Sequence, residues 1–371
     1  MRKCPYCDFN SHERGGELPE AAYVDALLAD LEGLLPEVWG RRARSVFIGG
    51  GTPSLFSAGA VDRLLCGIRA RLPLAPDAEI TLEANPGTAE AGRFRGYREA
   101  GVNRLSLGVQ SFDDARLRAL GRIHDAAEAR RALDMALRCF DNVNVDLMYG
   151  LPAQTLKDAC ADVREAIAAG APHVSAYQLA IEPNTAFFRH PPELPPHDLC
   201  ADMQEAIEDA LGAAGFEHYE ISAFARPGRR CGHNLNYWEF GDYLGLGAGA
   251  HGKISFPDRV TRHERVKQPD RYLSRRPNFQ EREVDAKELP FEFMLNALRL
   301  VEGFPSELFS LRSGLPLLSI EKRLVDAERK DLIERDWRRI RPTARGRRFL
   351  NELLGLFLGG ESEGPARNAR A

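Results

Sequence analysis

The sequence predicts an α/β protein built on an open or partial (β/α) barrel, followed by a small winged-helix-like module. Two observations predict the barrel. Short β-rich runs recur along the first 225 residues, and each is followed by a segment with helical periodicity. Such alternation is typical of a parallel sheet covered by helices. Polar or glycine-rich residues also stand where the runs end, at the edge that carries the ligand site in parallel α/β folds.

The predicted strands and helices alternate in a regular order. The first β-rich run ends in three glycines, and the sixth run follows a helix near 197–213. Alanine and leucine recur with helical spacing between the runs. The predicted strands are 44–51, 78–86, 102–112, 142–152, 173–183 and 218–222, and the predicted helices between them are about 20–35, 58–71, 90–100, 125–138 and 155–169.

The rest of the chain has a different pattern. Residues 226–285 are irregular and rich in arginine, glycine and aromatic residues. Two amphipathic helices, a short strand, a turn and a closing helix then follow, which is typical of a winged-helix-like module. The tail is small and polar, so we expect it to be disordered. The predicted domains are a barrel core over 1–225, a connecting segment over 226–285, the module over 286–358 and a tail over 359–371.

Composition and charge exclude several classes of protein. The chain has 371 residues and a net charge of −4, so no global basic surface indicates nucleic acid or anionic lipid as a partner. No apolar run approaches the roughly 20 residues of a membrane span, and the start lacks the apolar stretch of a signal peptide. We therefore expect a cytoplasmic location. Of the seven cysteines only Cys4 and Cys7 are close together, which favours metal or redox chemistry over a disulfide framework.

The motif "CPYCDF" over residues 4–9 has three common interpretations. A thioredoxin-like redox pair normally follows a strand, and none precedes it here. Half of a zinc site would require a second suitably spaced Cys or His pair, and none follows. The third interpretation is part of an iron–sulfur site, because thiolates are the natural ligands of such a cluster.

Motifs spread over most of the chain make the third interpretation specific. The segment "RKCPYCDFNSH" resembles the cluster loop of radical S-adenosylmethionine (SAM) proteins, in the branch that contains oxygen-independent coproporphyrinogen III oxidase and related heme chaperones. The resemblance implies a [4Fe-4S] cluster held by three cysteines, with the fourth iron open to SAM. The other matching segments are "GGGTPS" (49–54), "LEANP" (82–86), "GVQSF" (108–112), "GRIH" (121–124), "DLMYGLPAQT" (146–155) and "LGLGAGAHG" (244–252).

The same resemblance implies roles for individual residues. Cys4 and Cys7 match two cluster ligands. Glycines allow the backbone to approach a ligand where a side chain would collide, and an arginine suits the carboxylate of SAM. A surface salt bridge is the alternative for that arginine. The residues that match SAM-contacting positions are Gly50, Gly51, Thr52, Glu83, Gln110, Arg122 and Asp146.

The first cysteine of the family motif would fall one residue before Met1, where the family reads C-V-R-K-C and this chain reads M-R-K-C. A GTG codon encodes Val internally and Met at a start. We therefore expect the assigned start to lie within the cluster motif, so that the first barrel strand and the third cysteine ligand are encoded upstream. A genuine truncation with an inactive product is the alternative.

Two features distinguish the members of this branch. The oxidase carries a further cysteine two residues after the last ligand, and this chain has Phe9 there. The segment "HNLNYW" matches a heme-binding motif of the chaperones, which implies that His233, Asn234, Tyr237 and Trp238 contact heme. An imidazole can ligate heme iron, and flat aromatic rings suit a porphyrin. As an isolated hexapeptide the segment would instead indicate core aromatics and a hydrogen-bonded loop histidine.

A basic run lies near the C-terminus. Seven arginines and one acid, Asp336, lie between Arg335 and Arg348. Such a run is usually a solvated face, and it could also meet heme propionates, an acidic partner or nucleic acid.

Together these observations predict a partial (β/α)6 radical-SAM barrel with its first strand missing, followed by the winged-helix-like module. The resemblance implies a heme chaperone that binds heme, a [4Fe-4S] cluster and SAM and transfers heme to acceptors such as respiratory cytochromes, including membrane-associated ones. The alternative is an oxygen-independent coproporphyrinogen III oxidase of porphyrin biosynthesis. A nucleic-acid-directed radical SAM enzyme is third, and we expect no nucleic-acid partner.

Overall fold

The computed structural model describes residues 3–12, 18–88, 91–274 and 279–358, and the chain divides into two compact units. The predicted core 1–225 falls in the first unit, and the predicted module 286–358 falls in the second. The segment 226–285 contributes to both. The tail 359–371 lies outside the described residues. The first unit is Met1–Asn236, Tyr243–Ile254 and His263–Glu281, and the second is Tyr237–Asp242, Ser255–Arg262 and Arg282–Ala371.

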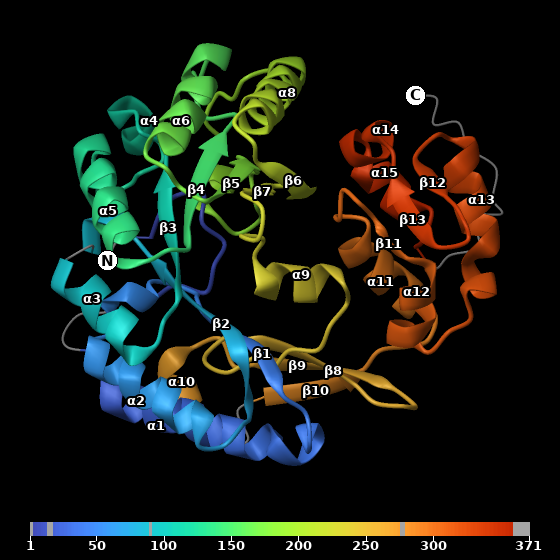
Figure 1. Ribbon diagram of the computed structural model, residues 1–371, viewed down its shortest axis with the longest axis horizontal. Helices are drawn as coiled ribbons and strands as arrows, with labels where there is room; N and C mark the ends of the chain where they lie inside the picture. The colour runs from blue at the N-terminus through green and yellow to red at the C-terminus, as the bar shows by residue number, and fades with distance from the viewer. Residues whose placement is uncertain (1–2, 13–17, 89–90, 275–278, 359–371) are drawn as a thin grey trace. The chain divides into compact units, whose positions relative to one another are not determined.

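The first unit is built on one curved sheet of seven strands (Figure 1), in the order β1-β2-β3-β4-β5-β7-β6. The first five strands pair in parallel and in chain order. This partial barrel confirms the predicted fold class. The strands are β1 (Ala43–Ile48), β2 (Leu74–Ala84), β3 (Arg104–Gln110), β4 (Val143–Tyr149), β5 (His173–Gln178), β6 (Glu217–Glu220) and β7 (Ala223–Ala225).

The sixth predicted strand differs from expectation in its pairing. It is β6, and it does not lie beside β5, because β7 is inserted between them and pairs antiparallel with both. Only two residues separate β6 from β7. A connection this short allows an antiparallel hairpin but no crossover to a parallel neighbour.

Helices line the outer side of this sheet (Figure 1). Their starts are set by local capping: Asp125 and Glu128 form a capping box, and Thr155 and Asp158 form another. The helices of residues 18–213 are α1 (Glu20–Leu34), α2 (Ala58–Arg69), α3 (Ala91–Ala100), α4 (Asp114–Ala119), α5 (Ala126–Cys139), α6 (Leu156–Ala168), α7 (Ala186–Arg189) and α8 (His197–Ala213), with short 3₁₀ turns at Leu35–Val38, Pro53–Leu55 and Pro86–Thr88.

The two faces of the sheet have opposite chemistry. Alternate strand residues such as Leu82, Leu107 and Val145 are buried in the apolar core with the helices. The residues between them are polar and stand in register across the sheet, as in the pairs Glu83–Ser106 and Ser106–Asn144. Because side chains alternate along a strand, these polar groups share the inner face of the partial barrel.

The segment predicted to be irregular contains short regular elements. Each has seven residues or fewer, which is too short for a clear periodicity. Three of the strands form a sheet in the order β10-β9-β8. The elements are α9 (Gly232–Trp238), β8 (His251–Ser255), β9 (Val260–Arg265), α10 (Pro269–Ser274) and β10 (Phe279–Glu283).

The second unit contains the expected helices and wing. Phe293 packs edge-on against Phe304 and Phe309 in its core. The wing is an antiparallel sheet in the order β11-β13-β12. The expected single closing helix is two short helices that break at Phe349. The elements are α11 (Leu289–Ala297), β11 (Phe304–Pro305), α12 (Ser306–Ser313), the 3₁₀ turn Leu317–Ile320, α13 (Glu321–Arg329), β12 (Ile333–Arg335), β13 (Arg339–Pro342), α14 (Ala344–Arg348) and α15 (Leu350–Gly355).

A buried ion pair between Asp30 of α1 and Arg265 of β9 holds α1 in place within the first unit. The Arg265 guanidinium donates to Asp30 through Nε at 2.9 Å and lies within 2.9 Å of it through Nη2. The Tyr272 hydroxyl donates to the same carboxylate at 2.9 Å. Both charged side chains are almost fully buried, at 0% and 4% exposure. Two charges removed from water remain favourable only while they are paired.

We therefore expect Asp30→Ala to lower the free energy of unfolding by roughly 3–5 kcal/mol, because it leaves a buried guanidinium without its counter-charge. Asp25 on the same helix pairs with Arg63 at the surface, where both side chains are about half exposed. Asp25→Ala should cost less than about 1 kcal/mol. Urea unfolding of both variants measures the difference, and equal losses would contradict this account of Asp30.

Candidate functional site

The N-terminal cysteine loop lies at the carboxyl ends of the parallel strands. Cys7 N donates to Cys4 O at 3.1 Å and closes a tight turn. Pro5 O accepts from Phe187 N at 2.9 Å. The Asn10 amide donates to Ala248 O at 3.0 Å and to Lys267 O at 2.7 Å. These contacts with later parts of the same unit hold the loop in place.

Arg122 joins this loop to the strand ends. Its Nη1 lies 3.8 Å from Cys4 Sγ. Its Nη2 donates to Asn85 Oδ1 at 2.6 Å and to Gly108 O at 2.7 Å. Its Nε is buried and has no hydrogen-bond partner among the described residues. A buried donor without a partner is costly, so this guanidinium is suited to a further acceptor. The surface salt bridge considered for Arg122 is absent from its described contacts.

Gln110 has an unusual backbone at the end of β3. Its φ is 70°, and the pairing register with β4 shifts between Gly108 and Gln110. A non-glycine residue in this region is strained by about 1–3 kcal/mol, and such residues cluster at ligand sites. A Cβ at Gly108 would stand 3.0 Å from Gln110 Nε2 and 3.7 Å from Arg122 Nη2. The structure therefore brings Gln110 and Arg122 to the same place.

The glycine motif and two carboxylates lie beside them. Gly50 has a φ of 123°, which requires glycine, and its N–H donates to Glu83 Oε2 at 3.0 Å. Thr52 Oγ1 donates to Gly51 O at 2.6 Å. Burial and the nearby charge of Asp146 raise the pKa of Glu83 to about 7, although the Gly50 N–H opposes the shift. Burial likewise raises the pKa of Asp146.

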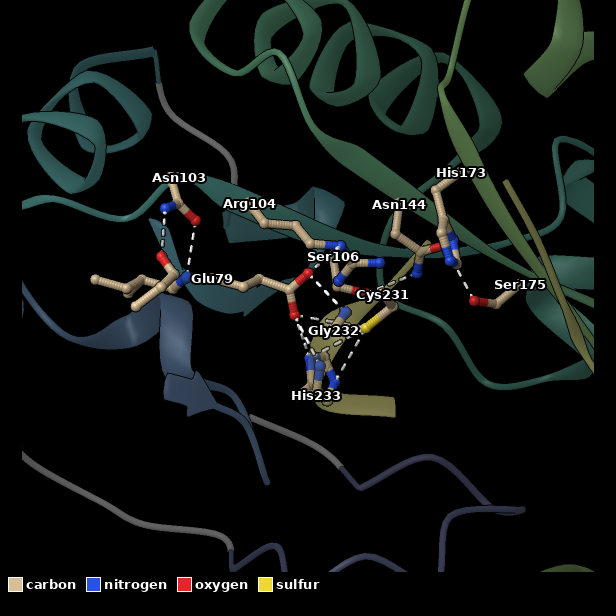
Figure 2. A network of polar contacts seen from close by, with 12 residues as sticks. Glu79, Asn103, Arg104, Ser106, Asn144, His173, Ser175, Cys231, Gly232 and His233 are labelled. Atoms are coloured by element: carbon tan, nitrogen blue, oxygen red, sulfur yellow. Dashed lines mark hydrogen bonds and ion pairs between the residues drawn. The ribbon is translucent and has the colours of Figure 1, made fainter. Parts of the chain in front are cut away.

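A polar network continues from Asp146 along the inner face. Asp146 accepts from Ser106 Oγ at 3.1 Å and from Asn144 Nδ2 at 2.7 Å. Asn144 Oδ1 lies 2.6 Å from His173 Nδ1 (Figure 2). His173 Nε2 lies 2.8 Å from the Tyr219 hydroxyl. Sequence reasoning singled out Asp146 but missed Ser106, Asn144, His173 and Tyr219. The signal for Ser106 and Asn144 was present in the alternation of polar and apolar residues in "LSL" and "NVNVD".

In the middle of β2, four residues before Glu83, Glu79 bonds the start of α9. Gly232 N and His233 N donate to its two oxygens at 2.9 Å and 3.0 Å. His233 Nδ1 lies 3.0 Å from Oε1, and Cys231 Sγ lies 3.1 Å from the same nitrogen. The His233 ring stacks on Phe47 with centroids 4.3 Å apart. His233 is therefore buried in a helix against the sheet, whereas an irregular loop was expected.

The surroundings of this cluster fix its protonation. Burial alone would raise the pKa of Glu79, but the His233 hydrogen bond and the Arg104 charge lower it to about 2. Burial lowers the pKa of His233 and raises the pKa of Cys231 to about 12. At neutral pH the cluster therefore contains a carboxylate, a neutral imidazole and a thiol.

The predicted heme motif is divided between the two units. His233 and Asn234 belong to the first, and Tyr237 and Trp238 belong to the second. In the second unit the Arg299 guanidinium lies 4.3 Å above the Trp238 ring. The predicted SAM and cluster positions, in contrast, gather at one edge of the first unit.

Comparison with known proteins identifies the family. The Radical SAM superfamily model matches residues 1–166, and the HemN C-terminal domain model matches residues 284–349. The chain is 50% identical over 365 residues to the heme chaperone HemW of Escherichia coli (strain K12), covering 96% of this chain and 95% of that protein. The chain belongs to the HemW family. The HemW of Haemophilus influenzae is 46% identical over 364 residues, with coverage of 96% and 95%.

Solved structures support the fold of this HemW-family chain. Coproporphyrinogen III oxidase (HemN) from Escherichia coli, a radical SAM enzyme, matches with a TM-score of 0.79 over 96% of this chain and 87% of that one. The sequence identity is 21%, so this likeness shows the fold alone. The prediction of a radical SAM barrel with a winged-helix-like module, in the heme chaperone group of the family, is thus confirmed.

The different pKa values of Glu79 and Glu83, both on β2, can be tested by measuring stability at two pH values. Folded Glu83 holds a proton up to about pH 7, whereas an unfolded glutamate releases it near 4.5. Stability should therefore fall as pH rises between these two values. We expect Glu83→Gln to raise the free energy of unfolding at pH 8 by about 1–3 kcal/mol and to change it little at pH 4. Urea unfolding at the two pH values measures this.

Glu79→Gln is the matched control, because Glu79 lies on the same strand and the same face as Glu83. The pKa of Glu79 in the folded protein is about 2, so the Glu79 carboxylate stabilises the fold above about pH 4.5. This contribution is lost only as the pH falls toward 2. The variant should lose roughly 3–5 kcal/mol at pH 8, because buried Arg104 loses its counter-charge. If Glu83→Gln destabilises at pH 8 in the same way, the raised pKa of Glu83 is wrong.

Proposed function

We propose that this chain binds heme, a [4Fe-4S] cluster and SAM, and delivers heme to acceptor proteins such as respiratory cytochromes. Membership of the HemW family supports the chaperone role. We place the protein in the cytoplasm and expect no nucleic-acid partner. None of the described helices is long and apolar enough to cross a membrane.

The strand-end site supports the cluster and SAM assignments. Cys4 and Cys7 supply soft sulfur ligands for iron. SAM carries a carboxylate, and the unpartnered Nε of Arg122 would be a suitable donor to it. Gly50 and Gly51 leave room for a ligand's approach, and a Cβ at Gly50 would meet nothing within 4 Å. Glu83, Gln110, Asp146 and Thr52 complete the proposed SAM residues.

The observation that carries the heme assignment is the contact between Glu79 and His233. With its Nδ1–H held by a carboxylate at 3.0 Å, the imidazole has its lone pair on Nε2. Metal-ligating histidines are commonly oriented in this way, because the carboxylate fixes the tautomer and raises the basicity of the ligating nitrogen. His233 is then the proposed axial ligand, and Asn234, Tyr237 and Trp238 are the proposed contacts of the porphyrin.

His233→Ala should shift the heme absorbance and weaken heme binding by roughly 10–100-fold, because the iron loses its nitrogen ligand. Heme titration followed by absorbance measures both effects. Because His233 is buried, the variant should also lose stability, so the melting temperature alone cannot decide the question.

His263→Ala is the matched control. His263 is another buried histidine of the first unit, on β9, with its ring 5.5 Å from Phe279. Its loss should lower stability by about 1–3 kcal/mol without changing the heme spectrum. Equal heme affinity in the His233 variant and the unmodified chain would contradict the assignment. Sustained formation of protoporphyrinogen from coproporphyrinogen, SAM and reductant would instead favour the oxidase.

The cluster assignment has its own test. In a chain to which a third cysteine is added one residue before Met1, Cys4→Ala or Cys7→Ala should abolish the iron–sulfur absorbance after anaerobic reconstitution, because no neighbouring group replaces a thiolate. Cys139→Ala is the control, since Cys139 is a partly buried residue of α5. Loss of the cluster in the Cys139 variant would show that the ligands are assigned wrongly.

A further inference from the structure

Three metal-ligating side chains of different chemistry meet where β2 approaches the start of α9 (Figure 2). Glu79 offers a carboxylate oxygen, Cys231 a sulfur and His233 an imidazole nitrogen. These atoms all lie within 4.8 Å of one another. The strand residue and the cysteine are 152 positions apart in the sequence, so the fold itself assembles the group. The proposed cluster, SAM and heme assignments make no use of Cys231.

The distances within the triad are close to those of a tetrahedral metal site. His233 Nδ1 lies 3.0 Å from Glu79 Oε1, Cys231 Sγ lies 3.1 Å from Nδ1, and Sγ lies 3.7 Å from Oε1. Zinc–ligand distances of about 2.0–2.3 Å in tetrahedral geometry give edges of roughly 3.4–3.6 Å between ligand atoms. Small side-chain movements of about half an ångström would therefore open a face of the tetrahedron for an ion.

We propose that Glu79, Cys231 and His233 bind a thiophilic divalent metal ion. The ion expected in the cell is Zn²⁺, and Co²⁺ can replace it as a probe that absorbs visible light. Sulfur and imidazole donors favour Zn²⁺ and Co²⁺ over Mg²⁺ and Ca²⁺, which prefer oxygen. Three protein ligands leave the fourth position for water or another ligand. Binding would form a metal–sulfur bond and release the Cys231 thiol proton to solvent. The ion would also take the place of the proton on His233 Nδ1, and the neutral imidazole would then carry its proton on Nε2.

The surroundings suit a bound cation. The two negative donors, thiolate and carboxylate, neutralise the charge of the ion. Backbone N–H groups of Gly232 and His233 orient the carboxylate, and that of Asn234 points to the Cys231 sulfur. Cys231 and His233 are buried, so the ion would be largely shielded from water. Hydrogen bonds of this kind hold metal ligands in position and contribute to affinity.

The test uses the full chain with Cys4→Ser and Cys7→Ser, which removes the other thiol pair, and without heme. Titration with Co²⁺ should give one bound equivalent, a sulfur-to-cobalt charge-transfer band in the near ultraviolet and visible bands of tetrahedral intensity. Adding Cys231→Ser should abolish the charge-transfer band. Adding Glu79→Gln should weaken binding by roughly 10–100-fold.

Cys200→Ser is the matched control, because Cys200 is also a buried free cysteine of the first unit. It should keep the band and the affinity. Circular dichroism checks that each variant folds, and Cys231→Ala replaces Cys231→Ser if the serine variant does not. Failure of the Cys4/Cys7 background to bind Co²⁺, or a charge-transfer band that persists without Cys231, would show that the triad is only a hydrogen-bonded cluster. The heme titration of His233→Ala is made without added divalent metal, so that failure of the metal proposal and failure of the heme proposal are distinguishable.

Discussion

The position of α9 depends on one carboxylate. Glu79 accepts the N–H groups of Gly232 and His233 and bonds the His233 ring, and it therefore fixes both the backbone and the side chain of the segment that carries "HNLNYW". Arg104 lies 3.9 Å from the same carboxylate and balances its charge. A buried carboxylate remains ionised only when donors and a counter-charge surround it. The fold supplies these from β3 and from a segment about 150 residues later in the chain.

Two carboxylates on the inner face of the sheet have very different electrostatic surroundings. Glu79 and Glu83 lie on one strand and face the same side, yet the pKa of the first is about 2 and that of the second is about 7. The His233 hydrogen bond and the charge of Arg104 outweigh burial and lower the pKa of Glu79, whereas burial and the charge of Asp146 raise the pKa of Glu83. On the neighbouring strands β3, β4 and β5, Ser106, Asn144 and His173 form a continuous series of hydrogen bonds. The carboxylate with unfavourable surroundings is the one where the proposed SAM residues gather, which is typical of sites that sacrifice stability for binding.

The sequence predicted the parts of the structure that repeat. Regular alternation of apolar runs and helical segments predicted β1 to β5 and their helices. The glycine motifs place the candidate site at the carboxyl edge of the sheet, and that assignment stays a prediction. The sequence could not predict that β7 inserts beside β5, because three residues carry no periodicity. It also could not predict that His233 meets Glu79, because a contact between positions 154 residues apart depends on the packing of the entire sheet. The same limit explains why Cys231, which is isolated in the sequence, was not predicted to lie beside Glu79 and His233.

His233 connects the two proposals through the position of a single proton. When Nδ1–H donates to Glu79, the lone pair on Nε2 can ligate heme iron. When an ion occupies the triad, Nδ1 is a ligand and the proton resides on Nε2, which can no longer bind iron. The two states therefore exclude each other at this imidazole. An ion in the triad would keep the histidine inactive toward heme, and heme ligation would require that Glu79 regains its hydrogen bond. The carboxylate that positions α9 would thus also determine which ligand the histidine accepts.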